Sequence, residues 1–126
     1  MSKKINPKPT TAELNLLRVL WPLGAATVKQ VHEAALKETP DIAYASVLRL
    51  MQIMYGKGLL TRDESERSHV YAPAHAQEAM QTNLLKEFIK KAFAGSGKEL
   101  VLAALSGHVS KKERKEIQQF LDGDKS

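Results

Sequence analysis

Closely spaced start and stop signals divide the first half of the chain into short helices. Thr10 with Glu13, and Thr27 with Gln30, have the spacing of a capping box, in which side chains satisfy the free N–H groups of a first helical turn. The stop signals are Pro22 with Gly24, Pro40, and the stretch Gly56, Lys57 and Gly58. Helices this short do not persist alone in water. The sequence therefore predicts three helices, the third over about residues 44–55, that share one core.

The segment after the third helix reads LLTRDESERSHVYAPA and indicates a surface hairpin. Two short stretches of strand-forming residues flank the polar sequence DESER, and Pro73 ends the second stretch. Three helices followed by a two-stranded hairpin are the order of a winged helix-turn-helix, whose third helix enters the DNA major groove. A winged helix that contacts only other proteins has the same order, so this alternative stays open.

The second half of the chain is predicted to be helical. Residues 75–93 form a long helical pattern whose apolar face is too broad to be left in water and therefore needs a partner. AGSG interrupts the pattern, KELVLAAL gives a short helix, and Ser110 with Glu113 begins a last helix. We expect a mainly α protein with a flexible basic arm (1–9), a winged helix-turn-helix domain (10–74), a small helical domain (75–122) and a frayed tail (123–126).

Composition limits the classes of protein that the chain can belong to. Its 126 residues suffice for one domain with a core and a smaller accessory unit. A net charge of +5 favours a polyanionic partner. The absence of cysteine excludes disulfides and thiolate metal sites. The start MSKKINPKPT has no apolar stretch behind its lysines, and no apolar run approaches the ~20 residues that cross a bilayer. We therefore expect a cytoplasmic protein without membrane insertion.

The third helix, within IAYASVLRLMQ, has an unusually small outer face. An inward stripe of Val47, Leu50, Met51 and Met54 leaves the opposite side with the candidate base-reading residues Ala45, Ser46, Arg49 and Gln52. Arginine suits bidentate contact with guanine and glutamine suits adenine, while small side chains allow close approach to a thymine methyl group. A solvated face with one incidental arginine is the alternative.

Residues outside the third helix are candidates for contact with the DNA backbone. They are Lys8, Thr10, Thr27, Lys29, Tyr44, Arg62, Arg67 and His69, together with Lys3 and Lys4 of the arm. Contacts of this kind position a protein without specifying sequence, and they weaken as salt rises. Asp63, Glu64 and Glu66 of the hairpin would repel a phosphate unless they point away, so Arg67 is the main candidate at the tip.

Enzymatic and metal-binding functions find no support in the sequence. His32, His69, His75 and His108 are scattered without the spacing of metal ligands. No glycine-rich phosphate loop, nucleophile elbow or paired-carboxylate arrangement is present. We expect no catalytic residue, no metal and no cofactor.

Several longer motifs resemble the penicillinase-repressor family, which includes the methicillin-resistance and copper-responsive repressors of bacteria. The resemblance covers residues 10 to about 122. Its most specific parts are Glu13 and Trp21, the helix AYASVLRLMQ, the exit GKGLL and the wing end HVYAP; AFAGSGKELVLAAL and VSKKERKEI also match. The resemblance implies a winged-helix transcriptional repressor that binds a palindromic DNA operator as a homodimer.

The resemblance also gives the unpartnered apolar face a role, because residues 75–122 would form the dimer interface. The interface candidates are Met80, Leu84, Leu85, Phe88, Ile89, Phe93, Leu100, Val101, Ala104, Leu105, Ile117, Phe120 and Leu121. A dimeric adaptor that presents the winged module to another protein is the competing hypothesis. An activator or architectural DNA-binding protein would have the same sequence features as a repressor.

The chain departs from the family pattern at positions that bear on recognition and regulation. The family's recognition helix usually begins with two hydroxyl residues, of which Ser46 matches and Ala45 does not. In antibiotic-responsive members a membrane sensor protease causes cleavage at an Asn-Phe pair, and the aligned residues here are Ala103 and Ala104. The cysteine motif of the copper-responsive members is absent. Proteolytic derepression through a sensor protease is therefore kept only as a hypothesis.

Overall fold

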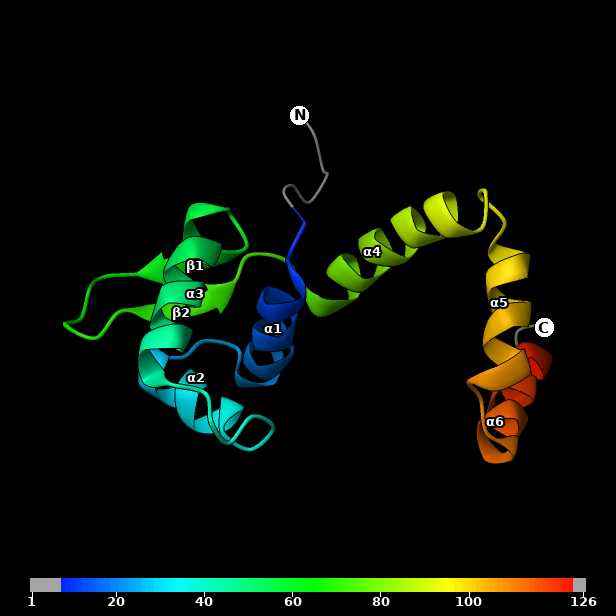
Figure 1. The fold of residues 1–126 in the computed structure, drawn as a ribbon, viewed down its shortest axis with the longest axis horizontal. Helices are drawn as coiled ribbons and strands as arrows, with labels where there is room; N and C mark the ends of the chain where they lie inside the picture. The colour runs from blue at the N-terminus through cyan, green and yellow to red at the C-terminus, as the bar shows by residue number, and fades with distance from the viewer. Residues whose placement is uncertain (1–7, 124–126) are drawn as a thin grey trace. The chain divides into compact units, whose positions relative to one another are not determined.

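The computed structural model describes residues 8–123 and is mainly helical, with one two-stranded antiparallel sheet (Figure 1). Its elements are α1 (Thr11–Leu23), α2 (Val28–Ala35), α3 (Tyr44–Gly56), β1 (Leu60–Asp63), β2 (Val70–Pro73), α4 (Gln77–Ala92), α5 (Gly97–Gly107) and α6 (Lys111–Gly123). This order confirms the predicted winged helix-turn-helix followed by helices. The chain divides into two compact units, a winged-helix unit that ends at Leu84 and a helical unit that begins at Leu85.

The predicted capping boxes begin the first two helices. The Glu13 N–H donates to the Thr10 hydroxyl at 3.2 Å, and the Thr10 N–H donates to the Glu13 carboxylate at 2.9 Å. Thr27 and Gln30 repeat these bonds at α2. The predicted stop at Pro22 with Gly24 is confirmed at Gly24, which caps α1 with a φ of 80°, a conformation that glycine adopts without strain. Pro22 itself lies within the last turn of the helix.

The third helix has the predicted inward stripe. Val47, Met51 and Met54 are buried in the core, while Leu50 is only half-buried against it. The helix ends where Gly58 adopts a φ of 83°, and this turn lets the N–H of Leu59 donate to the carbonyl of Met54 at 2.9 Å. The chain then passes directly into β1. Helix α3 and the hairpin are therefore joined by a short, hydrogen-bonded turn.

The hairpin is anchored to the helices through Tyr71. Strands β1 and β2 pair from Leu60 opposite Pro73 to Asp63 opposite Val70. Tyr71 is buried, and its backbone also exchanges two hydrogen bonds with Ala26, at 2.8 and 2.9 Å. The loop between α1 and α2 is thus joined to β2 by an isolated antiparallel bridge. This bridge could not be predicted from the sequence, because a single paired residue has no periodicity.

The core of the winged-helix unit includes part of α4. Its buried apolar residues are Leu16, Leu17, Leu20, Ala26, Val28, Val31, Ala35, Val47, Met51, Met54, Leu59, Leu60, Tyr71 and Met80. Met80 is only 1% exposed, and Leu84 packs against the same cluster. The indole N–H of Trp21 donates to the carbonyl of His75 at 3.1 Å, just before α4. The boundary expected at residue 74 is therefore too early, since the first turns of α4 complete the winged-helix core.

This burial also corrects one predicted interface residue. Met80 was expected in the dimer interface, but its side chain is enclosed by the core of its own winged-helix unit. It therefore offers no surface to a second chain. The helical periodicity of residues 75–93 predicts an apolar face correctly, yet it does not tell which part of that face is covered within the chain.

The helical unit, taken by itself, buries little. Neither α5 nor α6 contains a buried residue. Ser96 caps α5 by accepting from the Glu99 N–H at 3.1 Å, and Ser110 with Glu113 forms the predicted box at α6. Ala94 and Gly95, between α4 and α5, both have positive φ. Of the tail expected to be frayed (123–126), Gly123 is the last residue of α6, and residues 124–126 lie outside the described residues.

Candidate nucleic-acid interface

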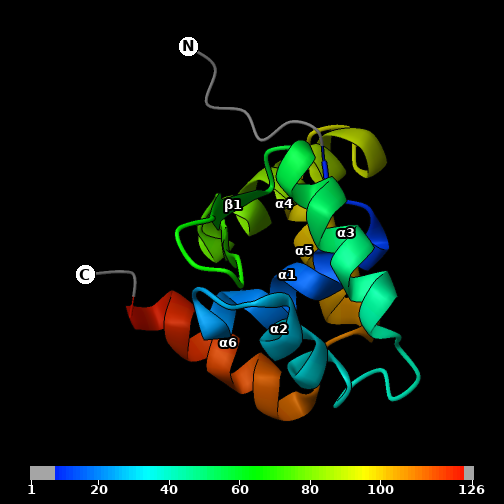
Figure 2. The same cartoon turned by 90° about the vertical axis from the view of Figure 1, so that its left-hand side faces the viewer.

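The outer face of α3 is open to solvent, as the sequence predicted. Ala45, Ser46, Arg49 and Gln52 are all exposed, while Val47 on the opposite side is fully buried. Figure 2 shows α3, α2 and the hairpin strand β1 on the side of the winged-helix unit that faces the viewer. The helix therefore presents two long polar side chains and two small ones on a surface that is flanked by other elements of the unit.

A hollow of about 370 Å³ connects that face to α2 and the wing. It brings together most of the residues predicted to contact DNA outside the arm. Those that line it are Thr27, Lys29, Tyr44, Gln52, Arg62, Arg67 and His69. They come from the start of α2, from α3 and from the hairpin. Segments far apart in the sequence thus form one continuous polar surface, which includes one base-reading candidate and six backbone candidates.

The start of α3 is held by an aromatic contact and lacks a side-chain cap. Ala43 occupies the N-cap position and makes no capping hydrogen bond from its side chain. The ring of Tyr44 meets that of His32 edge-on at 5.6 Å, and the His32 Nε2 lies 2.9 Å from the carbonyl oxygen of Ile42. Uncapped N–H groups at a helix start attract phosphates and other anions. This end of α3 is therefore suited to a backbone phosphate.

Two of the three acidic residues in the wing are engaged within the hairpin. Asp63 accepts the backbone N–H of Ser65 at 2.9 Å, which lowers the pKa of its carboxyl group. Glu64 accepts from the Nε of Arg62 at 2.6 Å. These contacts offset part of the repulsion that the sequence suggested for a phosphate near the tip. Arg67, which is exposed, is left with Glu66 as its acidic neighbour in the sequence.

Arg62, which was predicted to contact the DNA backbone, is surrounded by aromatic and acidic side chains of the protein itself. Its guanidinium lies 4.1 Å from the centre of the Tyr55 ring and 6.0 Å from that of Tyr71, and it pairs with Glu64. A cation between aromatic faces and a carboxylate is attracted to both. Arg62 thus connects the wing to the end of α3. Its charge is already partly balanced, so it attracts a phosphate less than a solvated arginine would.

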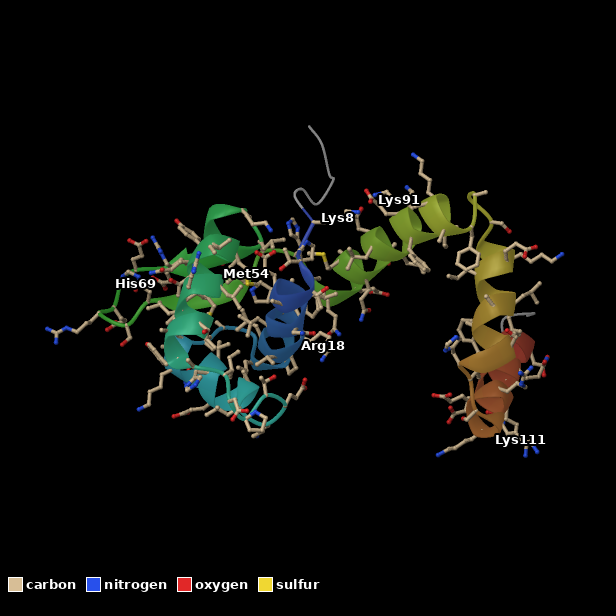
Figure 3. The ribbon with its side chains drawn as sticks, viewed as in Figure 1. Lys8, Arg18, Met54, His69, Lys91 and Lys111 are labelled. Atoms are coloured by element: carbon tan, nitrogen blue, oxygen red, sulfur yellow. The ribbon has the colours of Figure 1, made fainter. Side chains whose placement is uncertain are left out.

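The first residues of α1 lie apart from this surface. Figure 3 labels Lys8 beside the start of α1 and His69 at the wing, on different sides of the winged-helix unit. The Thr10 hydroxyl accepts the Glu13 N–H as a helix cap, and neither Lys8 nor Thr10 lines the hollow. The arm residues Lys3 and Lys4 lie outside the described residues. The structure therefore gathers the α2, α3 and wing candidates but not those at the start of α1.

The helical unit exposes the apolar residues predicted for an interface. Phe120 is 72% exposed, Phe88 is 54% exposed, and Leu85, Val101 and Leu121 are each about half exposed. Leu102, which is not among the predicted interface residues, is also 50% exposed. Half-buried positions within the unit are Ile89, Phe93, Leu100, Ala104, Leu105 and Ile117. So many large apolar side chains in contact with water indicate a surface that another molecule covers.

Other classes of site are not seen in the described residues. Residues 8–123 hold no group of three or more histidines and carboxylates placed to bind a metal. No helix in that range is both long enough and apolar enough to cross a membrane.

The exposed third helix, the wing and the hollow between them define a protein of the winged-helix DNA-binding class. The sequence profile of the penicillinase repressor family matches residues 9–123, and the chain belongs to this family. It is therefore a transcriptional regulator with a DNA-binding winged-helix fold, and not an enzyme.

Known relatives agree with this assignment. The chain is 28% identical over 95 residues to the transcriptional regulator BlaI of Mycobacterium tuberculosis, a match that covers 75% of this chain and 68% of the relative. The DNA-binding domain of the repressor BlaI, solved in solution, is 25% identical with a TM-score of 0.50, over 60% of this chain and 90% of that one. RosR of H. salinarum, at 14% identity and a TM-score of 0.54 over 94% of both chains, shares the fold.

Proposed function

We propose that the protein is a cytoplasmic repressor that binds a palindromic DNA operator as a homodimer. The observation that carries this proposal is the polar surface in which the open face of α3 meets the hollow lined by Lys29, Tyr44 and Arg67. A helix with small residues at its start can approach the floor of the major groove, where Arg49 and Gln52 match the edges of guanine and adenine. The backbone candidates on either side would hold the register.

Charge on this surface is suited to DNA rather than to an acidic small molecule. Lys29 on α2, Arg49 on α3 and Arg67 in the loop of the hairpin are exposed, so the positive charge is spread over the surface instead of converging on one point. A duplex offers phosphates on both sides of the major groove, which is the pattern that such a distribution matches. The similar domain of BlaI is described as a DNA-binding domain of a repressor, which supports the same role here.

The homodimer is proposed from the apolar surface of the helical unit. Burying side chains such as Phe88, Val101 and Phe120 against a second copy would remove from water the surface that this unit leaves exposed. A twofold axis places the same residues on both sides of the interface, so one apolar face suffices for both partners. A dimer would also carry two recognition helices, which a palindromic operator requires.

A selection of binding sequences from random duplex DNA tests the proposal. The selected duplex and a scrambled control are then titrated at two salt concentrations, and the protein mass is measured by sedimentation with and without DNA. A twofold-symmetric duplex that binds one dimer far more tightly than the control supports the proposal. Equal, weak binding that disappears with salt would mean that charge alone acts. The winged module would then be assigned to a protein partner.

Proteolytic derepression is a separate hypothesis about how the repressor is released. The family's cleavage pair is replaced by Ala103 and Ala104 in α5. Incubation with the membrane sensor protease encoded beside the regulator, if such a protease is found, should yield a fragment cut in α5. An intact chain after incubation would remove this hypothesis and leave the DNA-binding proposal unaffected.

A further inference from the structure

A partly buried ion pair joins the start of α1 to the residue after α3. The Glu13 carboxylate accepts from the Lys57 Nζ at 2.6 Å and from the Thr10 N–H at 2.9 Å. Glu13 is 3% exposed, and Lys57, the residue that follows α3, has a side chain that is 25% exposed. Glu13 was predicted only as a helix cap and Lys57 only as part of a helix stop. Their contact therefore gives both residues a second role.

Glu13 is charged under ordinary conditions. Burial by itself raises the pKa of Glu13, but the hydrogen bonds from Lys57 and Thr10 lower it, and the net result is a pKa below the usual glutamate value. A buried ion pair often stabilises a fold no better than well-packed apolar residues would. What distinguishes an ion pair from an apolar contact is its defined geometry. The short contact between carboxylate and ammonium fixes where both side chains lie.

Orientation matters for α3 because its core contacts are not directional. Val47, Met51 and Met54 pack against the core through apolar contacts, which have little orientational preference. The start of α3 has no side-chain cap and is held by the ring contact of Tyr44 with His32, while Tyr55 near its end contacts Arg62 of the wing. The contact of Lys57 with Glu13 adds a charged hydrogen bond that ties the end of α3 to α1. Base recognition needs side chains held to within about 0.5 Å and 10–20° of their productive position. A contact that fixes the end of α3 therefore affects Arg49 and Gln52 without touching DNA.

We propose that Glu13 and Lys57 are a positioning pair that sets the orientation of α3 for base recognition. The pair then governs the preference for one sequence over another more than the general affinity for DNA. This inference rests on the proposed function, because it needs a sequence that the wild-type protein prefers.

The variant Glu13→Gln isolates the ion pair from the helix cap. A glutamine at this position of a capping box keeps the cap, as Gln30 shows beside Thr27 in this same chain. Glu113→Gln is the matched control, because Glu113 forms the same box with Ser110, and at an exposed site. Both substitutions remove one negative charge. They differ in whether the carboxylate is bound to a lysine at the end of α3.

The measurement is the dissociation constant of each variant for the selected duplex and for the scrambled duplex. Assays are run well below the unfolding midpoint of every variant, determined by circular dichroism. Glu13→Gln should weaken the selected complex about tenfold, the size of losing part of one bidentate base contact, and leave the scrambled complex within about twofold. Glu113→Gln should change neither. The double variant Glu13→Gln with Lys57→Gln should lose no more preference than Glu13→Gln alone.

Other outcomes would overturn the inference. An unchanged ratio between the two duplexes in Glu13→Gln would mean that the pair does not orient α3. An equal loss on both duplexes would mean that the pair supports the fold alone. If the wild-type protein itself shows no preference between the duplexes, the proposed function fails, and this inference fails with it.

Discussion

Met80 and Phe88 lie about two turns apart on α4, yet the structure assigns them to different compact units. Met80 is 1% exposed in the winged-helix core, and Phe88 is 54% exposed on the helical unit. Truncation of each to alanine should therefore act on a different equilibrium. Met80→Ala should lower the stability of the winged-helix unit, whereas Phe88→Ala should weaken dimerisation.

The two magnitudes follow from burial. Removing a buried methionine side chain costs about 2–5 kcal/mol, which lowers the melting temperature of a unit this size by about 8–40 °C. Full burial of a phenylalanine gives about 1.5–3 kcal/mol, and about half of Phe88 is available to a partner. With two copies in a symmetric dimer, Phe88→Ala should cost about 1.6–3.2 kcal/mol, or about ten- to two-hundredfold in the dimer dissociation constant.

Thermal unfolding at two protein concentrations, combined with sedimentation, separates these effects. The drop in melting temperature for Met80→Ala should be the same at both concentrations, whereas that for Phe88→Ala should depend on concentration. Gln81→Ala, at an exposed position of the same helix, is the control and should change neither quantity by much. A weakened dimer with unchanged melting for Met80→Ala would refute the assignment of the first turns of α4 to the winged-helix core.

Three further predictions concern the winged-helix unit. Arg49→Ala should cost about 1–3 kcal/mol on the selected duplex with relaxed preference for one base, whereas Lys29→Ala should weaken all duplexes alike; titration of both duplexes distinguishes them. Gly58→Ala should destabilise by about 1–2 kcal/mol, because φ is 83° there although nothing lies within 4 Å of an added Cβ. Gly56→Ala, in helical conformation and equally unobstructed, should be neutral or slightly stabilising in the same denaturant titration. Because the folded-state pKa of Glu13 is lowered, its contribution is present above the ordinary glutamate pKa and is lost as pH falls through the folded value. Stability measured against pH should therefore fall less steeply in acid for Glu13→Gln than for the wild type, and parallel curves would contradict this.

The predictions that succeeded rest on local patterns. The capping boxes at Thr10 and Thr27 depend on residues three positions apart, and the stripe of Val47, Met51 and Met54 depends on one helical period. Both are complete within a few consecutive residues. For this reason the element order, and with it the class of fold, could be predicted from the sequence.

The features that were missed join residues distant in the sequence. Lys57 reaches Glu13 across 44 positions, and the Ala26 bridge to Tyr71 pairs a loop with a strand. The charge or type of a single residue is compatible with many interaction partners in the chain. Which two residues actually pair is decided only by the tertiary fold. Met80 shows the same limit for apolar residues. Its helical face was predicted, but the surface that covers it was not.

The small number of cations on the proposed DNA interface would make the proposed dimerisation part of DNA recognition. In the described part of the winged-helix unit, the exposed cations on this surface are Lys29, Arg49 and Arg67, since Arg62 is paired with Glu64 and stacked on Tyr55. Few phosphate contacts from one winged-helix unit would give an affinity in the range of non-specific binding, about 10⁻⁴ to 10⁻⁶ M. When two such units are linked, the second binds at a high effective concentration, and the half-site affinities multiply. In the proposed function, the apolar surface of the helical unit and the small, modestly charged face of α3 are therefore two requirements of the same mechanism.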